Sequence, residues 1–288
     1  MQPRSFGVIG DPIAHSLSPI IHEALYRAME LPFTYGRERV EKGDLSAFIR
    51  RLPELGWDGF NITMPHKKDI LPFLEDVEGE AAVCESVNTV RVDKGRLYGT
   101  STDGPGFHLA LQQVGFDVSG AHILILGAGG VTKALAYRLA EGGAEAITVL
   151  NRTVSKARDL ADFIYGRWDV DTAYGPLDLD EMESWSEDAD LLINTTALGM
   201  AGFADFPSFA FLEALNPDAL VADLIYHPRP TSLLAAAREL ELTTLDGLPM
   251  LINQAVYAFE FMTGLAAPKD AFLVAGNALK AHGVFQSH

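Results

Sequence analysis

The sequence is poor in cysteine and in positive charge, and it has no long apolar run. Its 288 residues include a single cysteine, Cys84, so an internal disulfide cannot form. The 22 lysines and arginines are outnumbered by 39 aspartates and glutamates, and the net charge of −17 argues against binding nucleic acid or an anionic membrane surface through general electrostatics. No apolar segment approaches the roughly 20 residues that cross a bilayer, and the N-terminal segment MQPRSFGVIGDPIAHS lacks the apolar core of a signal peptide. We therefore expect a cytoplasmic protein that captures any anionic ligand through local groups.

Metal-binding patterns are also missing, because the eight histidines form no HxxxH arrangement and no CxxC pair exists. Cys84 is more simply explained by core packing than as a nucleophile. Apolar residues make up 48% of the chain and charged residues 21%, the balance of a compact folded protein. The length favours two domains with a cleft, and no metal is expected.

The first hundred residues have the pattern of an α/β unit. Its expected elements are a strand over Phe6–Gly10, a helix over Pro19–Met29 with Ser18 as N-cap, an amphipathic helix over Asp44–Leu52, a strand over Gly59–Met64, and a hairpin of Val87–Val92 with Arg96–Gly99.

Near Asp103 the pattern changes to the alternation of helices and apolar strands that a parallel βαβ sheet requires. The expected helices are Pro105–Val114, Val131–Glu141 and Ser155–Ile164, and the expected strands are Ala121–Leu126, Ala146–Leu150, Leu191–Asn194 and Leu220–Asp223. The acidic stretch Asp178–Asp190 is interpreted as solvated surface. After Gly247 the chain is strongly helical again, but periodicity does not say which domain these helices join.

A glycine cluster, Gly127-Ala128-Gly129-Gly130, follows the strand Ala121–Leu126 and opens the next helix at Val131. Backbone N–H groups and the helix dipole can face a pyrophosphate there, although a tight strand-to-helix turn alone would also use glycine. The next strand ends in Asn151-Arg152-Thr153, where an NAD site usually has an acidic residue. A guanidinium at that point suits a 2′-phosphate, so NADP(H) is the expected cofactor. Lys156 adds a second cation, although by itself it is typical of a solvated helix face.

Three further segments carry candidate reactive groups, each with a simpler alternative. Ser16 and Ser18 precede a helix and could present hydroxyl donors to a carboxylate, or Ser18 could only cap the helix. Lys67 follows a strand end, where α/β proteins place reactive groups, but taken alone it is more simply an exposed lysine. Asp103 lies at the expected domain junction, or it could cap the helix that follows.

In combination, these segments resemble the shikimate dehydrogenase family, in the same order over nearly the whole chain. The matching segments are Gly10-Asp11-Pro12 with His15-Ser16-Leu17-Ser18-Pro19, Asn61-Ile62-Thr63-Met64-Pro65-His66-Lys67, Val87-Asn88-Thr89, Thr102-Asp103, Gly127 to Gly130, Asn151-Arg152-Thr153, Asp223-Leu224-Ile225-Tyr226 with Pro228 and Thr231, and Gly247 through Gln254.

The resemblance implies two α/β domains. One is a substrate-binding and catalytic domain of residues 1–103 completed by the C-terminal helices at 248–288, and the other is an NADP-binding Rossmann-like domain of residues 104–247. It implies that Ser16, Ser18 and Tyr226 hold the substrate carboxylate, and that Thr63, Asn88, Asp103 and Gln254 bond ring hydroxyls. The implied cofactor contacts are Gly127, Ala128, Gly129, Gly130, Val131, Asn151, Arg152, Thr153, Lys156, Leu224 and Gly247.

The implied reaction is the reversible, NADPH-dependent reduction of 3-dehydroshikimate to shikimate in aromatic amino-acid (chorismate) biosynthesis. Lys67 and Asp103 would form a catalytic pair, with Lys67 giving a proton to the carbonyl oxygen. Burial tends to discharge a lysine and a nearby carboxylate keeps it charged, so the pair can hold a proton ready. The expected partners are the small-molecule substrate and cofactor, and the chain is expected to be a monomer or a homodimer.

Four positions depart from the family pattern. Ser101 stands where asparagine commonly precedes Thr-Asp, and Ala197 replaces a serine in the 194–200 loop. Glu85-Ser86 replaces a Gly-Ala pair, and His66 replaces an apolar residue. His66 could tune Lys67, but it is more simply interpreted as pointing to solvent. The alternatives are a quinate/shikimate or aminoshikimate dehydrogenase of broader specificity, with Arg152 speaking against the NAD-preferring branch, and a non-catalytic regulator that binds NADP or shikimate.

Overall fold

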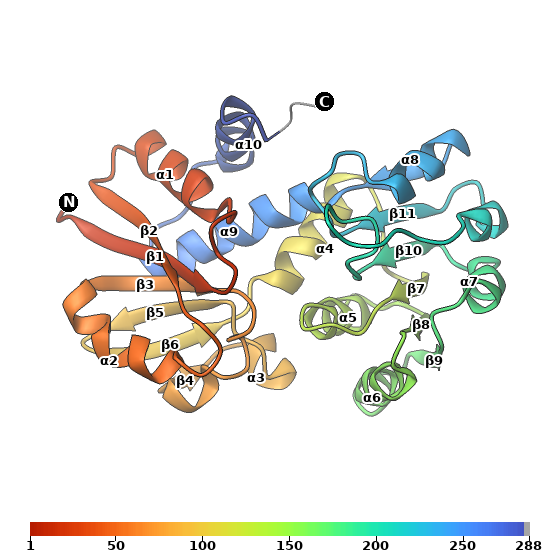
Figure 1. Ribbon diagram of the computed structural model, residues 1–288, viewed down its shortest axis with the longest axis horizontal. Coiled ribbons are helices and arrows are strands. Elements are labelled where there is room, and N and C mark those ends of the chain that lie inside the picture. The colour runs from red at the N-terminus through yellow and green to blue at the C-terminus, as the bar shows by residue number, and fades with distance from the viewer. Residues whose placement is uncertain (285–288) are drawn as a thin grey trace. The chain divides into compact units, whose positions relative to one another are not determined.

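The computed structural model describes residues 1–284, which divide into two compact units (Figure 1). The first unit consists of Met1–Gly106 and the described part of Leu251–His288, and the second unit is Phe107–Met250. The chain passes from one unit to the other within helices α4 (Asp103–Gln113) and α9 (Gly247–Thr263). The boundaries between the units lie after residues 106 and 250. The resemblance implied boundaries three residues earlier, after 103 and 247.

The first unit contains a mixed sheet of six strands in the order β2-β1-β3-β5-β6-β4. Strands β1 (Arg4–Gly10), β2 (Phe33–Arg39) and β3 (Trp57–Ile62) are parallel, and β5 (Thr89–Asp93) and β6 (Arg96–Thr100) form an antiparallel hairpin beside them, with the two-residue β4 (Asp76–Val77) on β6. Because β1 and β3 are parallel neighbours, the loops that follow them emerge at the same edge of the sheet.

Helices cover this sheet and close its core. They are α1 (Ser18–Ala28), α2 (Leu45–Leu55), η1 (Leu71–Phe73), α3 (Glu80–Cys84), the second part of α9, and α10 (Ala271–Ala281), which lies against α1 (Figure 1). Fully buried aromatic residues of β1, α1 and α9 contact one another, with Tyr26 between Phe6 and Phe259. The C-terminal helices therefore belong to the first unit, as the resemblance implied.

The second unit is a parallel sheet of six strands in the order β12-β11-β10-β7-β8-β9. The strands are β7 (His122–Leu126), β8 (Ala146–Leu150), β9 (Asp171–Gly175), β10 (Leu191–Asn194), β11 (Leu220–Asp223) and β12 (Thr243–Leu245). The chain goes outward from β7 in one direction through β8 and β9 and in the other through β10 to β12, so the loop after β7 lies at the point where the strand order reverses. In open α/β sheets that point is where ligands bind.

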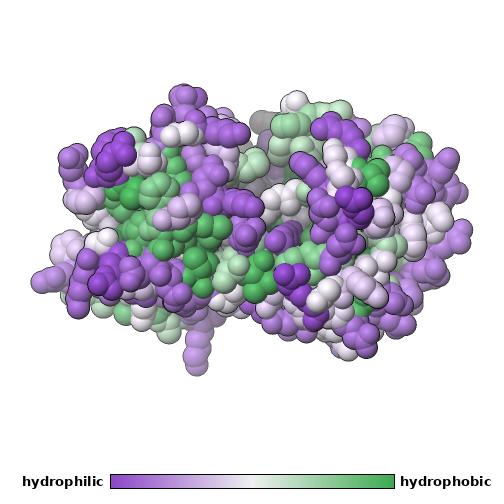
Figure 2. All heavy atoms as spheres, turned by 90° about the horizontal axis from the view of Figure 1, so that it is seen from below, coloured by the Kyte–Doolittle hydropathy of each residue, from purple (hydrophilic) through white to green (hydrophobic). Residues whose placement is uncertain are grey.

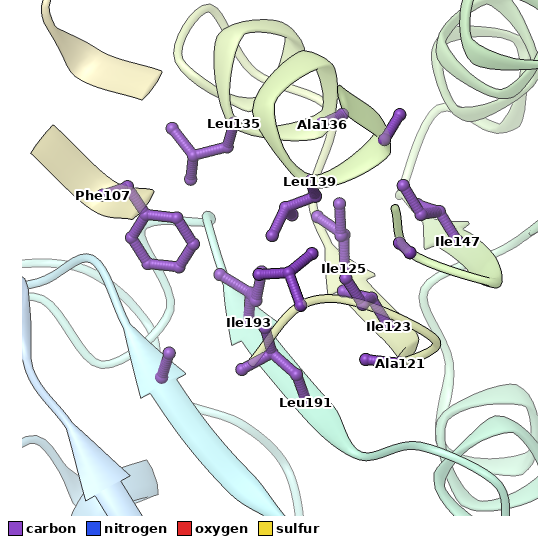
Figure 3. Packing of buried hydrophobic residues seen from close by; sticks show 14 of the residues in the cluster. Phe107, Ala121, Ile123, Ile125, Leu135, Ala136, Leu139, Ile147, Leu191 and Ile193 are labelled. Atoms are coloured by element: carbon purple, nitrogen blue, oxygen red, sulfur yellow. The ribbon is translucent and has the colours of Figure 1, made fainter. Parts of the chain in front are cut away.

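The helices of the second unit are α5 (Thr132–Glu141), α6 (Val154–Tyr165), α7 (Leu179–Ser186), η2 (Ala210–Ala214) and α8 (Ser232–Glu239), with most of α4. Their apolar faces pack on both sides of the sheet. Figure 3 shows one of these cores, in which Leu135 and Leu139 of α5 meet Ile125 of β7 and Ile193 of β10. A sheet covered on both faces explains why its strands are near-continuous apolar runs in the sequence.

Several short or polar elements were not predicted from the sequence. Strand β2 has the sequence FTYGRER and β9 is DTAYG, and both are edge strands whose pattern is too polar to read as a core strand. The acidic stretch Asp178–Asp190 is not only solvated surface, because it contains α7, whose N-cap Asp178 accepts from the Glu181 N–H at 3.0 Å and whose Met182 is buried.

The surface is largely hydrophilic on the face shown in Figure 2, with an apolar area over part of the first unit. No helix within residues 1–284 combines the length and the apolarity that crossing a bilayer requires.

Candidate active site and nucleotide site

The structure brings together Lys67 and Asp103, which lie 36 residues apart in the sequence. Lys67 is in the turn after β3 and Asp103 is the first residue of α4. The Lys67 Nζ lies 2.5 Å from Asp103 Oδ2, and the two side chains are 21% and 9% exposed. Lys67 is therefore not a freely solvated lysine: its ammonium is tied to a buried carboxylate and still reaches the surface of the first unit.

Asn88 holds the other oxygen of the same carboxylate. Its Nδ2 donates to Asp103 Oδ1 at 2.9 Å and to Thr102 Oγ1 at 3.0 Å, and its Oδ1 accepts from the Thr102 N–H at 2.9 Å. The Thr102 hydroxyl in turn lies 3.4 Å from Gln254 Oε1. Asn88, Asp103 and Gln254, which the resemblance assigned to ring hydroxyls, are thus in one hydrogen-bonded cluster.

Gly106 explains how Gln254 reaches this cluster. A Cβ at position 106 would lie 2.8 Å from the Gln254 backbone nitrogen, and Asn253 Nδ2 donates to the Gly106 carbonyl at 3.2 Å. A glycine is needed because α4 and the second part of α9 pass each other at backbone contact distance.

Ser16 lies in the loop between β1 and α1, and Ser18 is the first residue of α1, so both follow β1 at the same sheet edge as the segment of Thr63 to Lys67. The Thr63 N–H donates to Ile9 at 2.9 Å, and a Cβ at Gly10 would lie 2.9 Å from the Met64 carbonyl, so the two loops are in contact. Ser18 is not the N-cap of α1: Leu17 is, without a side-chain bond, and the Ser18 N–H is 3.4 Å from Ser16 Oγ. The Ser18 hydroxyl is not used for capping and interacts with the Tyr35 phenol instead.

The structure corrects the interpretation of His66. The ring is fully buried instead of pointing to solvent, and its Nε2 lies 2.7 Å from the Val40 carbonyl oxygen, to which it donates. No sequence pattern indicated this contact, because Val40 follows the unpredicted strand β2. Cys84 is buried, as expected for core packing, and Ser101 is buried beside the cluster. Glu85 has a φ of 54° and closes α3.

The glycine turn between β7 and α5 is built as a cradle. Gly127 has a φ of 108°, and a Cβ there would lie 2.6 Å from Thr195 Oγ1, whereas a Cβ at Gly130 would meet nothing within 4 Å. The Ala128 and Gly129 N–H groups are bonded to Asn151 Oδ1 (3.1 Å) and Thr132 Oγ1 (3.0 Å). Gly130 and Val131 are left with amides that have no acceptor among the residues the structure describes. Open space and free amides at a helix start fit a pyrophosphate.

Beside this turn lies a hollow of about 390 Å³, lined by Ala128, Gly129, Lys133, Lys156, Asp159, Leu160 and Phe163. Lys156 thus lines a concave site and not only a solvated helix face. Sequence reasoning missed Lys133, which is two residues into α5 and lies 4.3 Å from the centre of the Phe163 ring. Arg152 is exposed at the end of β8, and its neighbour Asn151 bonds both the glycine turn and the Thr153 carbonyl. Two lysines and an arginine next to the cradle fit the extra phosphate of NADP.

The segment after β11 holds Leu224 and Tyr226 and contacts Gly247, three residues to which the resemblance assigned a ligand. Gly247 packs on Leu224, where a Cβ would meet the Leu224 carbonyl, and its N–H donates to Ile225 at 3.2 Å. Tyr226 is half-buried, and burial raises the pKa of its phenol. Asp223, which the sequence did not assign a role, anchors this segment by accepting from Thr231 Oγ1 (2.7 Å), Asn194 Nδ2 (3.1 Å) and the Ile225 N–H (3.1 Å). Burial raises the pKa of Asp223 to about 6.

Within the described part of the chain, no group of three histidines, cysteines or acidic residues is arranged to hold a metal ion. The groups that these two sites offer are a lysine–carboxylate pair, hydroxyl and amide donors, and a phosphate cradle.

Comparisons with known proteins agree with this arrangement. Family models described as the shikimate dehydrogenase substrate binding domain, shikimate / quinate 5-dehydrogenase, and the shikimate 5'-dehydrogenase C-terminal domain match residues 8–90, 108–201 and 247–273. A shikimate dehydrogenase (NADP(+)) of Methanothermobacter thermautotrophicus is 39% identical over 264 residues, 92% of each chain.

Two solved structures have the same fold throughout. A shikimate dehydrogenase in complex with NADP+ matches 97% of this chain and 96% of its own, with 34% identity and a TM-score of 0.86. A 5-ketofructose reductase of Gluconobacter sp. matches 97% of this chain and 99% of its own, with 31% identity and a TM-score of 0.86. From its sequence relatives, its fold and the residues gathered at its two sites, the chain belongs to the shikimate dehydrogenase family.

Proposed function

We propose that this protein catalyses the reversible, NADPH-dependent reduction of 3-dehydroshikimate to shikimate, a step of aromatic amino-acid biosynthesis. The observation that carries the proposal is the Lys67–Asp103 pair at 2.5 Å, in one hydrogen-bonded cluster with Asn88, Thr102 and Gln254. A reduction of this kind needs one proton donor at the carbonyl oxygen and several hydroxyl-binding groups around it.

Lys67 is the proton donor in this proposal. Reducing a ketone to a secondary alcohol adds a hydride to carbon and a proton to oxygen, and bound NADPH supplies the hydride. The Lys67 ammonium gives its proton to the carbonyl oxygen, and in the reverse direction the amine takes it back from the hydroxyl. Asp103 fixes the ammonium through Oδ2, so the donor nitrogen is held in position when the substrate binds.

The remaining polar groups orient the substrate. Ser16 and Ser18 present hydroxyls to the carboxylate, and Thr63, Asn88, Asp103 and Gln254 bond the ring hydroxyls. Tyr226 is proposed as a further donor to the carboxylate. These groups let the site select a polyhydroxylated ring acid, because a buried donor or acceptor that stays unpaired penalises a substrate lacking the matching group.

On the cofactor side, the amides of Gly130 and Val131 with the glycine turn take the pyrophosphate, and Leu224 and Gly247 are proposed to contact the nicotinamide part. Arg152, Thr153 and Lys156, with Asn151 shaping the turn, take the adenosine end. The local cations favour NADP over NAD, because a guanidinium binds a phosphate with paired, charge-assisted bonds. A cytoplasmic location and a monomeric or homodimeric state remain predictions.

A substrate panel tests the proposal. Purified protein is mixed with shikimate, quinate, aminoshikimate or fructose, each with NADP+ and with NAD+, and the absorbance at 340 nm is followed. We expect shikimate with NADP+ to give the highest kcat/KM. Quinate with NAD+ as the best pair would support the broader-specificity alternative, and the sugar as the best substrate would indicate a function like that of the 5-ketofructose reductase. No reaction with any pair, despite binding of NADP+ or shikimate, would favour the regulator.

A further inference from the structure

Beneath Asn88 lies a set of buried polar side chains that the proposed reaction does not use. Tyr35 of β2, Asn61 of β3 and Thr89 of β5 are 5%, 6% and 0% exposed. Tyr35 Oη is 2.6 Å from Asn61 Oδ1, Asn61 Nδ2 is 2.9 Å from Thr89 Oγ1, and Thr89 Oγ1 is 2.9 Å from Asn88 Oδ1. With Asn88 bonded to Asp103, and Asp103 to Lys67, the contacts are continuous from the outer strand of the sheet to the ammonium.

Backbone groups fix the direction of every bond in this series. Asn61 Nδ2 also bonds the Asn88 carbonyl at 3.2 Å, which can only accept, so the amide oxygen of Asn61 faces Tyr35 and the phenol must donate. At the other end, the Thr102 N–H can only donate, so Asn88 Oδ1 faces it and Asn88 Nδ2 faces Asp103. The Thr89 hydroxyl accepts from Asn61 and gives its single proton to Asn88. Each link donates toward Asp103.

The first donor is secured by its surroundings. Burial raises the pKa of the Tyr35 phenol well above its usual value, so the phenol keeps its proton at neutral pH. The His22 ring stacks on Tyr35 with centroids 4.4 Å apart and an angle of 6°, and burial lowers the pKa of His22 to about 3. The imidazole stacked on the phenol is therefore neutral at physiological pH.

We propose that Tyr35, Asn61 and Thr89 are positioning residues that act through Asn88: they hold its carboxamide with the nitrogen toward Asp103, and so keep Asp103 Oδ2 aimed at Lys67. The proposal rests on the catalytic role proposed for Lys67 and Asp103. If the Asn88 carboxamide turned over, its oxygen would face a carboxylate oxygen and the Thr102 N–H would lose its acceptor, so a looser Asn88 means a less well aimed Lys67.

The central test removes one hydroxyl and keeps its shape. Thr89→Val should lower kcat for shikimate oxidation about 10-fold and change KM by a smaller factor. The reason is that a misaligned proton-transfer group slows turnover more than it weakens substrate binding. Thr89→Ser, which keeps the hydroxyl, should restore kcat to within about 2-fold of the unmodified protein. Thr148→Val, at a buried threonine of β8 in the second unit, is the matched control and should leave kcat unchanged.

A double-mutant cycle separates positioning from general loss of structure. If Thr89 acts through Asn88, adding Thr89→Val to Asn88→Ala should slow kcat no further, whereas independent damage would multiply. Unchanged kcat in Thr89→Val, equal loss in Thr89→Ser, or multiplicative effects in the cycle would each overturn the proposal. Should Thr89→Val fail to fold, Tyr35→Phe removes the first donor, and unchanged kcat in that variant would equally overturn the positioning role.

Lys67→Ala is measured alongside these variants to keep the two proposals apart. Normal turnover in Lys67→Ala defeats the proposed catalytic pair itself. A slow Lys67→Ala combined with a normal Thr89→Val defeats only the positioning role.

Discussion

Asp223 makes the stability of this protein depend on pH in the direction opposite to that of a salt-bridged acid. The side chain is 1% exposed, and its burial raises the pKa from 3.8 to about 6. Because the folded state binds the proton more tightly than the unfolded state, this group stabilises the fold fully only below pH 3.8, and the contribution is lost as the pH rises through 6.

The size of the effect follows from the shift. Moving from 3.8 to about 6 corresponds to about 3 kcal/mol over the full titration. Integrating between about pH 4.5 and about pH 7.5, about 2 kcal/mol of the free energy of unfolding should disappear. The charged form persists at neutral pH because Thr231, Asn194 and the Ile225 N–H donate to it.

Asp223→Asn isolates this contribution. Urea unfolding of the unmodified protein and of the variant is followed by circular dichroism at several pH values, and the difference between their free energies of unfolding cancels the other titrating groups. We expect this difference, unmodified minus variant, to fall by about 2 kcal/mol from about pH 4.5 to about pH 7.5. A difference that stays constant, or that rises with pH, would refute the reasoning that burial dominates over the three donated hydrogen bonds.

Three further outcomes are expected. Lys67→Ala should lower kcat for shikimate at least about 100-fold while the Kd for NADP+, measured by fluorescence titration, stays the same; near-normal turnover would contradict the proton-donor role. Arg152→Ala should raise KM for NADP+ about 10-fold and leave KM for NAD+ unaltered in steady-state assays, whereas equal effects on both cofactors would speak against contact with the 2′-phosphate. Gly106→Ala places a Cβ 2.8 Å from the Gln254 backbone nitrogen and should destabilise the protein by about 1–3 kcal/mol in urea unfolding, so an unchanged midpoint would show that the two helices can separate without cost.

Much of the fold could be predicted from the sequence because its core strands are apolar runs of distinctive length. The strands of the second unit at Ala146–Leu150, Leu191–Asn194 and Leu220–Asp223 agree residue for residue with the prediction. The hairpin turn at Lys94 and Gly95 could be predicted because a two-residue turn needs positive φ values, which glycine adopts readily. The observed φ values are 50° and 78°. Edge strands such as β2 were not predicted. An edge strand carries many polar side chains, and these obscure the alternation of apolar and polar residues that marks a strand.

For the site, the sequence by itself determined the identities and the order of the groups: a lysine after one strand, an aspartate at a helix start, a glycine turn, and an arginine where an acid is more usual. Local chemistry was enough there, because glycine turns and side-chain charge depend on the residues themselves and their immediate neighbours. Only the tertiary structure decided that Lys67 meets Asp103, that His66 turns inward to Val40, that Lys133 joins Lys156 at the glycine turn, and that Tyr35, Asn61 and Thr89 stand behind Asn88. These contacts join residues that are far apart in the chain, and their bond directions are set by backbone groups whose positions exist only once the sheets have formed.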